Sequence, residues 1–126
     1  MEARERNVLS YKTPSGVFPF RIWRDSFSDE DVLAAIYART TRFSAGNFGD
    51  SEPVGNGVSE SKINLGPGYR VYYGIDGGDV ILLCGGDKST QDADTIRARE
   101  YWKDYKERRG DESSRGRKKR SPDAPC

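Results

Sequence analysis

The residues best suited to chemistry lie in two short stretches, INLGPGYRVYY at 63–73 and VILLCGGDKSTQ at 80–91. Arg70 follows a Gly-Pro-Gly turn in the first stretch, Lys62 precedes that stretch, and Lys88 lies in the second. A guanidinium can hold two phosphate oxygens at once, and ammonium groups add point charge beside it. These three residues therefore predict a site for a nucleic-acid phosphate, provided that the fold brings them together.

Two tyrosines and an asparagine accompany the candidate cations. Tyr69 and Tyr72 flank Arg70 closely in the chain, and Asn64 lies just before the turn. Aromatic rings can stack on nucleic-acid bases, so we predict an RNA-binding role for Tyr69, Tyr72 and Asn64. The alternative is a surface arginine paired with an acidic residue, with the tyrosines only filling sheet positions, and Lys88 as a solvated loop lysine paired with Asp87.

Three strands are expected to position these side chains. They are predicted at 58–65, 69–75 and 80–84, with reversals at 66–68 and 76–79 that are rich in Gly and Pro. Side chains alternate across a strand, so Lys62 and Asn64 share one face, as do Arg70 and Tyr72. The uninterrupted run VILLC indicates a strand that is covered on both sides.

The first half of the chain predicts one strand and two helices. The strand is expected at 7–13, and Pro19 opens a short helix over 20–27. In the run SDED, Ser28 is the predicted N-cap of the main helix, which ends near Gly46. The segment 47–57 is rich in Gly, Asn and Pro and is predicted to be a loop.

A last helix is predicted over 91–109 and would cover the sheet. Ala98, Tyr101, Trp102 and Tyr105 supply its apolar side, and aromatic residues at this spacing are more often core than site. The tail 110–126 carries five Lys and Arg against three Asp and Glu and has no aromatic residue. Such a composition predicts disorder. The domain is therefore expected to span 1–109, followed by a disordered basic tail over 110–126, which is either an electrostatic arm for nucleic acid or simply a solvated terminus.

Composition excludes several kinds of site. The chain of 126 residues has no histidine, so His-based zinc sites, Ser-His-Asp triads and histidine acid–base pairs are not available. Cys84 lies in an apolar run and Cys126 ends the chain, which favours free thiols. No stretch is long and apolar enough for a membrane span, and no leader is apparent, so a cytoplasmic location is expected.

Several motifs in order resemble the RelE/ParE toxin superfamily, in particular its HigB-like "addiction module killer" branch. The similarity rests on AGNFGDSEPVGNGVSE, GPGYRVYYG, VILLCGGDKSTQDADTIRARE and YWKDY, and it spans about residues 8–108. The joint occurrence of these motifs is more specific than any one of them.

This resemblance implies a compact α+β RelE-like domain. An N-terminal strand and two helices would precede an antiparallel sheet of three to four strands and a C-terminal helix. It also implies the toxin of a type II toxin–antitoxin module, which cleaves mRNA on the ribosome without metal or other cofactor. Its partners would be that mRNA and a cognate antitoxin, expected to be a helix-turn-helix protein. Arg70, Lys62 and Lys88 would be the catalytic residues.

Some positions depart from the family pattern. Asn64 stands where some cleaving members have a second lysine, and Ser61 replaces a large apolar residue, which predicts a looser core beneath the site. The catalytic tyrosine or histidine near the C-terminal helix has no clear counterpart. Two alternatives therefore stay open, a ParE-like inhibitor that binds DNA gyrase without catalysis and a degenerate module that keeps only antitoxin binding.

Overall fold

The elements alternate between helical and extended structure along the chain. This computed structural model describes residues 5–119. In chain order the elements are β1 (Asn7–Ser10), α1 (Pro19–Asp25), α2 (Glu30–Phe43), β2 (Asp50–Gly55), β3 (Val58–Ile63), β4 (Tyr69–Asp76), β5 (Asp79–Gly86), the 3₁₀ helix η1 (Lys88–Thr90) and α3 (Gln91–Lys119). The predicted α+β class is confirmed.

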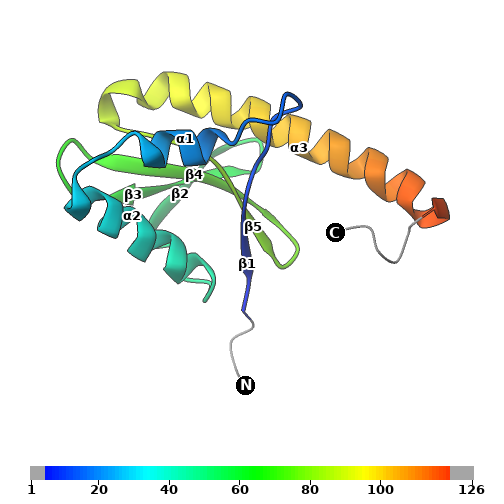
Figure 1. The fold of residues 1–126 in the computed structure, drawn as a ribbon, viewed down its shortest axis with the longest axis horizontal. Helices are drawn as coiled ribbons and strands as arrows, with labels where there is room; N and C mark the ends of the chain where they lie inside the picture. Colours follow the sequence, from blue (N-terminus) through cyan, green and yellow to red (C-terminus); the bar gives the residue numbers. More distant parts are fainter. Residues whose placement is uncertain (1–4, 120–126) are drawn as a thin grey trace.

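A mixed sheet of five strands forms the middle layer, in the order β1-β5-β4-β3-β2 (Figure 1). β2 to β5 form an antiparallel meander, whereas β1 pairs with β5 in parallel. The prediction of a wholly antiparallel sheet of three to four strands is therefore wrong. Which strand lies beside β1 depends on pairing between residues about 70 positions apart, such as Asn7 with Asp79, and local patterns do not report it.

Strand β2 occupies part of the segment that was predicted to be a loop. Pro53 and the glycines argued against a strand, but β2 is an edge strand, and an edge tolerates proline. Asn56 and Gly57 make the tight reversal into β3, both with positive φ (57° and 87°). Asn-Gly between two extended segments is a strong hairpin signal, and it was present in the sequence.

Helices cover both faces of the sheet. One face packs against α1 and α2 through an apolar cluster that includes Phe20, Ile36, Phe43, Val71 and Leu82. The other face packs against α3 through Val58, Tyr72, Leu83, Ala98 and Trp102, among others. β5 contacts both α1 and α3, so the prediction that VILLC is covered on both sides is confirmed.

Helix ends differ from the predictions in two places. The N-cap of α2 is Asp29, whose side chain accepts a hydrogen bond from Asp31 N at 2.9 Å, rather than Ser28. α3 continues to Lys119 instead of ending near Arg109, since adding a residue to a formed helix costs less than starting one. Residues 120–126 of the predicted tail lie outside the described residues, and the disorder expected there stays a prediction.

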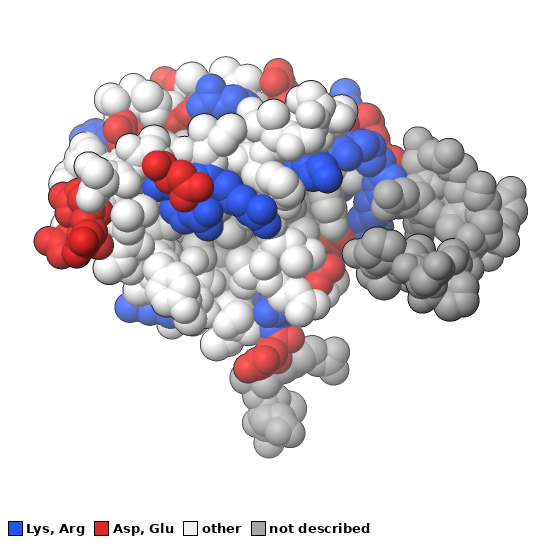
Figure 2. Space-filling view, in the orientation of Figure 1, with Lys and Arg blue, Asp and Glu red and all other residues white. Residues whose placement is uncertain are grey.

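Charge is mixed on the face of the molecule shown in Figure 2. Basic and acidic side chains are interspersed there, and the acidic group at the left edge matches the start of α2, where Glu30 and Asp31 lie in the first turn. Positive charge on this face is therefore local, and the net charge of +1 does not predict where it gathers.

Candidate phosphate-binding site

Four of the six predicted site residues line one pocket. Lys62, Asn64, Arg70 and Lys88 surround a hollow of about 320 Å³, together with the loop residues 65–68. Lys62 lies directly opposite Arg70 in the β3–β4 register, and Arg70 lies opposite Gly86 in β5. Three neighbouring strands thus end at the same edge of the sheet, which brings together cations that are up to 26 positions apart in the chain.

The Gly-Pro-Gly loop orients Arg70. Gly66 and Gly68 have positive φ angles of 54° and 84°, a conformation that favours glycine. The carbonyl oxygen of Gly68 accepts a hydrogen bond of 2.8 Å from Nη1 of Arg70. The same turn that reverses the chain therefore also fixes one edge of the guanidinium.

The buried carboxylate of Glu60 lies beside the guanidinium of Arg70. The Arg70 side chain is 7% exposed, and its Nε lies 3.7 Å from Oε1 of Glu60, which is 8% exposed. This Nε is buried and has no hydrogen-bond partner. Gln91 Nε2, at the start of α3, donates to both Glu60 oxygens at 3.2 Å. The alternative considered for Arg70, an ion pair with an acidic residue, is thus present with Glu60. Arg70 nevertheless also lines the pocket.

Lys88 lies at the start of η1 and is exposed. Asp87 caps this turn, since its Oδ1 accepts hydrogen bonds from Ser89 N at 2.8 Å and Ser89 Oγ at 2.6 Å. The Ser89 hydroxyl is the main cause that lowers the pKa of Asp87, and the charge of Arg70 adds to it. Asp87 therefore serves the turn that presents Lys88 to the pocket.

The two predicted tyrosines do not line this pocket. Tyr72 is 0% exposed and packs under α3, and burial raises the pKa of its phenol. Tyr69 packs against Trp23 and Phe27 on the opposite face of the sheet, with ring centroids 6.4 Å and 5.2 Å away. A ring buried in the core cannot stack on a base, so the placement of Tyr72 on the RNA-binding surface is wrong. Tyr72 was correctly predicted to share a strand face with Arg70, but α3 covers that face at Tyr72.

Sequence reasoning overlooked the polar residues beneath the pocket. Arg39 of α2 donates from Nη1 to Ser61 Oγ at 2.8 Å and to the carbonyl oxygen of Lys62 at 2.7 Å. Ser61 is fully buried and donates to Phe48 O at 2.7 Å. The looser core predicted at Ser61 is therefore wrong, because a hydrogen-bonded link fills this position. Glu60 could have been found, since it shares a strand face with Lys62.

The lining of the pocket is basic and rich in hydrogen-bond donors. Its lining side chains provide an amide and three cations but no carboxylate or imidazole, so they stabilise negative charge and cannot take up a proton at neutral pH. Asp50 of β2 lies opposite Lys62 in the β2–β3 register. Cys84 is buried with its thiol pKa raised to about 12 by burial, which leaves it no nucleophilic role. The prediction of a free thiol at Cys126 lies outside the described residues.

Two other kinds of site are absent from the described part of the chain. Residues 5–119 hold no group of three or more His, Cys, Asp or Glu side chains arranged to bind a metal ion. None of the helices in that range has the length and apolar character that a membrane span requires.

Comparison with known proteins identifies a clear relative. No protein-family model matches the chain. No solved structure matches it either. The chain is 47% identical over 81 residues to an uncharacterized protein of Haemophilus influenzae, an alignment that covers 64% of this chain and 82% of the relative. The chain therefore belongs to the same family as this Haemophilus influenzae protein.

Proposed function

We propose that this protein is the toxin of a type II toxin–antitoxin module, a HigB-like member of the RelE/ParE superfamily that cleaves mRNA on the ribosome. The observation that carries the proposal is the convergence of Lys62, Arg70 and Lys88 on one pocket. The α+β architecture, with two helices before an antiparallel meander and a helix after it, agrees with the RelE-like fold that the resemblance implies.

The proposed reaction uses the ribose of the substrate. Its 2′-oxygen attacks the adjacent phosphorus, the bond from phosphorus to the 5′-oxygen breaks, and a 2′,3′-cyclic phosphate results. The proton of the 2′-hydroxyl passes to water or to a phosphate oxygen, and the leaving 5′-oxygen takes a proton from solvent. Arg70 and the two lysines stabilise the charge that develops on the phosphorus oxygens, and removing one such donor typically costs about 10²–10³-fold in rate.

Induced expression with mapping of RNA ends tests this function. The wild-type protein should stop translation and produce mRNA ends inside codons, whereas Arg70→Ala should lower cleavage at least about 100-fold. Arg42→Ala, which removes an exposed arginine near the end of α2, is the matched control and should cut normally. Unchanged cleavage by Arg70→Ala would contradict the assignment of the site.

Arg70→Ala also leaves Glu60 as an unpaired buried charge, so its fold needs a check. Removing one partner of a buried ion pair typically costs about 3–5 kcal/mol. Arg70→Ala combined with Glu60→Gln removes both charges and should fold and stay inactive. Lys62→Ala and Lys88→Ala, at less buried positions, should each reduce cleavage without a change in thermal unfolding.

A degenerate antitoxin-binding module is the second candidate. The deep burial of Arg70, its pairing with Glu60 and the lack of a proton acceptor in the pocket favour it. It predicts normal growth after induction together with tight binding to a helix-turn-helix antitoxin. DNA damage and altered supercoiling with translation at first unaffected would instead indicate a ParE-like gyrase inhibitor.

A further inference from the structure

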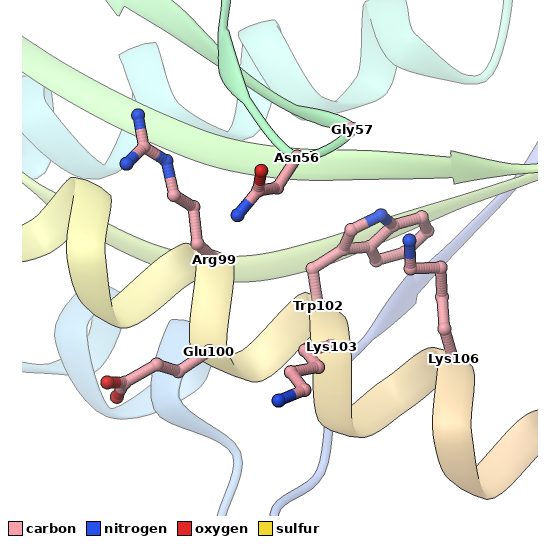
Figure 3. A pocket seen from close by; sticks show the side chains of 7 residues that line it. All are labelled: Asn56, Gly57, Arg99, Glu100, Trp102, Lys103 and Lys106. Carbon is pink, nitrogen blue, oxygen red and sulfur yellow. The ribbon is translucent and has the colours of Figure 1, made fainter.

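A second pocket on the protein combines fixed cations with a tight turn. It has a volume of about 410 Å³ and lies between the β2–β3 turn and the middle of α3 (Figure 3). Its lining residues are Asn56, Gly57, Arg99, Glu100, Trp102, Lys103 and Lys106. The function proposed above does not use any of them.

Two of its cations are held in place by the fold. Nε of Arg99 donates to the carbonyl oxygen of Val54 at 2.8 Å, and its Nη2 bonds to the same oxygen. The ammonium of Lys106 lies over the ring of Trp102, 5.7 Å from the ring centroid. Positioned charges of this kind lose less side-chain entropy when an anion binds than free surface lysines do.

The remaining side chains make the pocket a donor-rich site. Figure 3 shows Arg99, Trp102 and Lys106 directed from α3 toward the turn, with the Asn56 amide beside them, while the carboxylate of Glu100 points away. The ammonium of Lys103 also points away from the turn in the same view, on the same side of α3 as Glu100. The interior therefore offers positive charge and an amide to an anion, and the lone carboxylate of the lining does not oppose it.

The shape of the pocket favours a phosphate over a base. Trp102 is 5% exposed, and its ring stacks on that of Tyr105, with centroids 5.2 Å apart and planes at 9°. The indole therefore has little free face for a base to stack on. Guanidinium, ammonium and amide groups are the ordinary partners of a phosphodiester, and such contacts do not depend on sequence.

Both pockets lie on the side of the sheet that α3 covers. Val58 packs under α3, Glu60 bonds to Gln91 of α3, and Lys62 shares their strand face. Gly57 in the turn and Lys62 in β3 lie about 17 Å apart at about 3.3 Å per residue. Val58 and Glu60 between them are buried under α3, so an RNA strand that reaches both pockets passes over the surface of α3 or the β2 edge. A single strand of several nucleotides can cover this span, since single-strand sites commonly take about 4–16 nucleotides.

We propose that the pocket formed by Asn56, Arg99 and Lys106 binds a backbone phosphate of the same single-stranded RNA whose cleavage is proposed at Arg70. This inference rests on the proposed function for the identity of its ligand. This second phosphate site holds the RNA at a distance from the reacting phosphate. It adds affinity without a preference for particular bases.

Fluorescence anisotropy with a labelled 2′-O-methyl RNA of about 12 nucleotides tests the proposal, because this probe cannot be cut by its own ribose. The double variant Asn56→Gly/Lys106→Ala, in which glycine keeps the positive φ of position 56, should bind about three- to tenfold more weakly. Its plot of log affinity against log salt should be shallower by about 0.7 for each phosphate that the variant no longer neutralises. Arg42→Ala should match wild type, and Glu100→Gln should match it or bind more tightly. Unchanged affinity and salt slope in the double variant would overturn the proposal.

The fluorescence of Trp102 gives a second readout that does not depend on activity. In a Trp23→Phe background, Trp102 is the remaining tryptophan. RNA should change its emission, because a bound phosphate draws the Lys106 ammonium off the ring, and Lys106→Ala should abolish most of that change. A response to poly-glutamate but not to RNA would overturn the proposal in favour of an acidic protein partner.

The two proposals fail in different ways. If Arg70→Ala leaves mRNA cleavage intact or no cleavage occurs, the reaction is wrong, while RNA binding that depends on Asn56 and Lys106 still supports the second site. If cleavage requires Arg70 but the double variant binds RNA like wild type, only the second site is wrong. Lys62→Ala can also be combined with the double variant. If the combined loss of affinity equals the sum of the two separate losses, the two phosphate sites act independently.

Discussion

Arg39 shows how a single buried side chain positions the candidate site. Its guanidinium crosses from α2 to β3, where it bonds to Ser61 Oγ and to the carbonyl oxygen of Lys62. Burial lowers the pKa of Arg39, and nearby Arg42 adds to this effect. The carbonyl oxygen of Lys62 and the hydroxyl oxygen of Ser61 compensate part of the free-energy cost of burying this guanidinium. The backbone at Lys62 is therefore fixed by a residue that lies outside the pocket.

Ser61→Ala should destabilise the protein by about 0.5–1.5 kcal/mol in urea unfolding. Arg39 Nη1 loses one of its two acceptors and keeps the Lys62 carbonyl, and Phe48 O loses one of its two donors and keeps Ser51 Oγ. The control is Ser61→Ala combined with Arg39→Met, which removes both polar partners. Its loss of stability should be smaller than the sum of the two single losses. A strictly additive result would show that the two side chains do not interact.

At the scale of elements, the start of α2 depends on one capping side chain. Ser28 and Asp29 are both acceptable N-caps by residue type, and the run SDED does not distinguish them. In the structure Asp29 has extended backbone angles (φ −74°, ψ 117°) and accepts the hydrogen bond from Asp31 N. The helix therefore starts at Glu30, one residue after the cap that is used.

Asp29→Ala should lower the free energy of unfolding by about 1 kcal/mol, which is the usual loss for an N-cap. Ser28→Ala, one residue earlier, is the matched control and should change stability by less than about 0.5 kcal/mol. Thermal or urea unfolding followed by circular dichroism compares the two. A loss confined to Ser28→Ala would instead place the cap at Ser28.

At the scale of the whole molecule, two tryptophans pack against glycines in the sheet. Trp102 of α3 lies over Gly74 in β4, where an added Cβ would meet the ring carbon Cε3 at 2.6 Å. Trp23 of α1 approaches Gly85 of β5 even more closely on the other face. The close approach of both helical layers thus requires the absence of a side chain at these strand positions.

Gly74→Ala should destabilise the fold by about 1–3 kcal/mol, because the added methyl group overpacks against a rigid indole. Gly78→Ala is the control, since a Cβ there meets nothing within 4 Å and its φ is not in the left-handed region. Urea unfolding measures both variants. Equal stability of the two variants would contradict the close packing of α3 on the sheet.

A polar contact joins the residue that follows β1 to α3. The hydroxyl of Tyr11 donates to Asp104 Oδ2 at 2.6 Å, and Nε of Arg108 donates to the same oxygen at 2.9 Å. Burial by itself raises the pKa of Asp104, but the hydrogen bonds from Arg108 and Tyr11 outweigh it and hold this pKa below its ordinary value.

Because the folded pKa of Asp104 is lowered, its contribution to stability is present above the unfolded value of about 3.9 and is lost as the pH falls through the folded value. Asp104→Asn should therefore be less stable than wild type at pH 7. The difference should shrink toward zero as the pH falls below about 4. Urea unfolding across this pH range measures it, and a difference that persists unchanged at the lowest pH would exclude the charge of Asp104 as its cause.

The sequence by itself determined the order of most elements, the reversal at 66–68 and the residues of the candidate pocket that share a strand face. These features are local, since turn residues and side-chain alternation act within a few positions of the chain. Only the tertiary structure decided that β1 is parallel to β5, that Tyr72 is covered by α3 and that Glu60 lies against Arg70. Each depends on which segments meet across the sheet, and contacts between distant parts of a chain leave no periodic signal in the residues that make them.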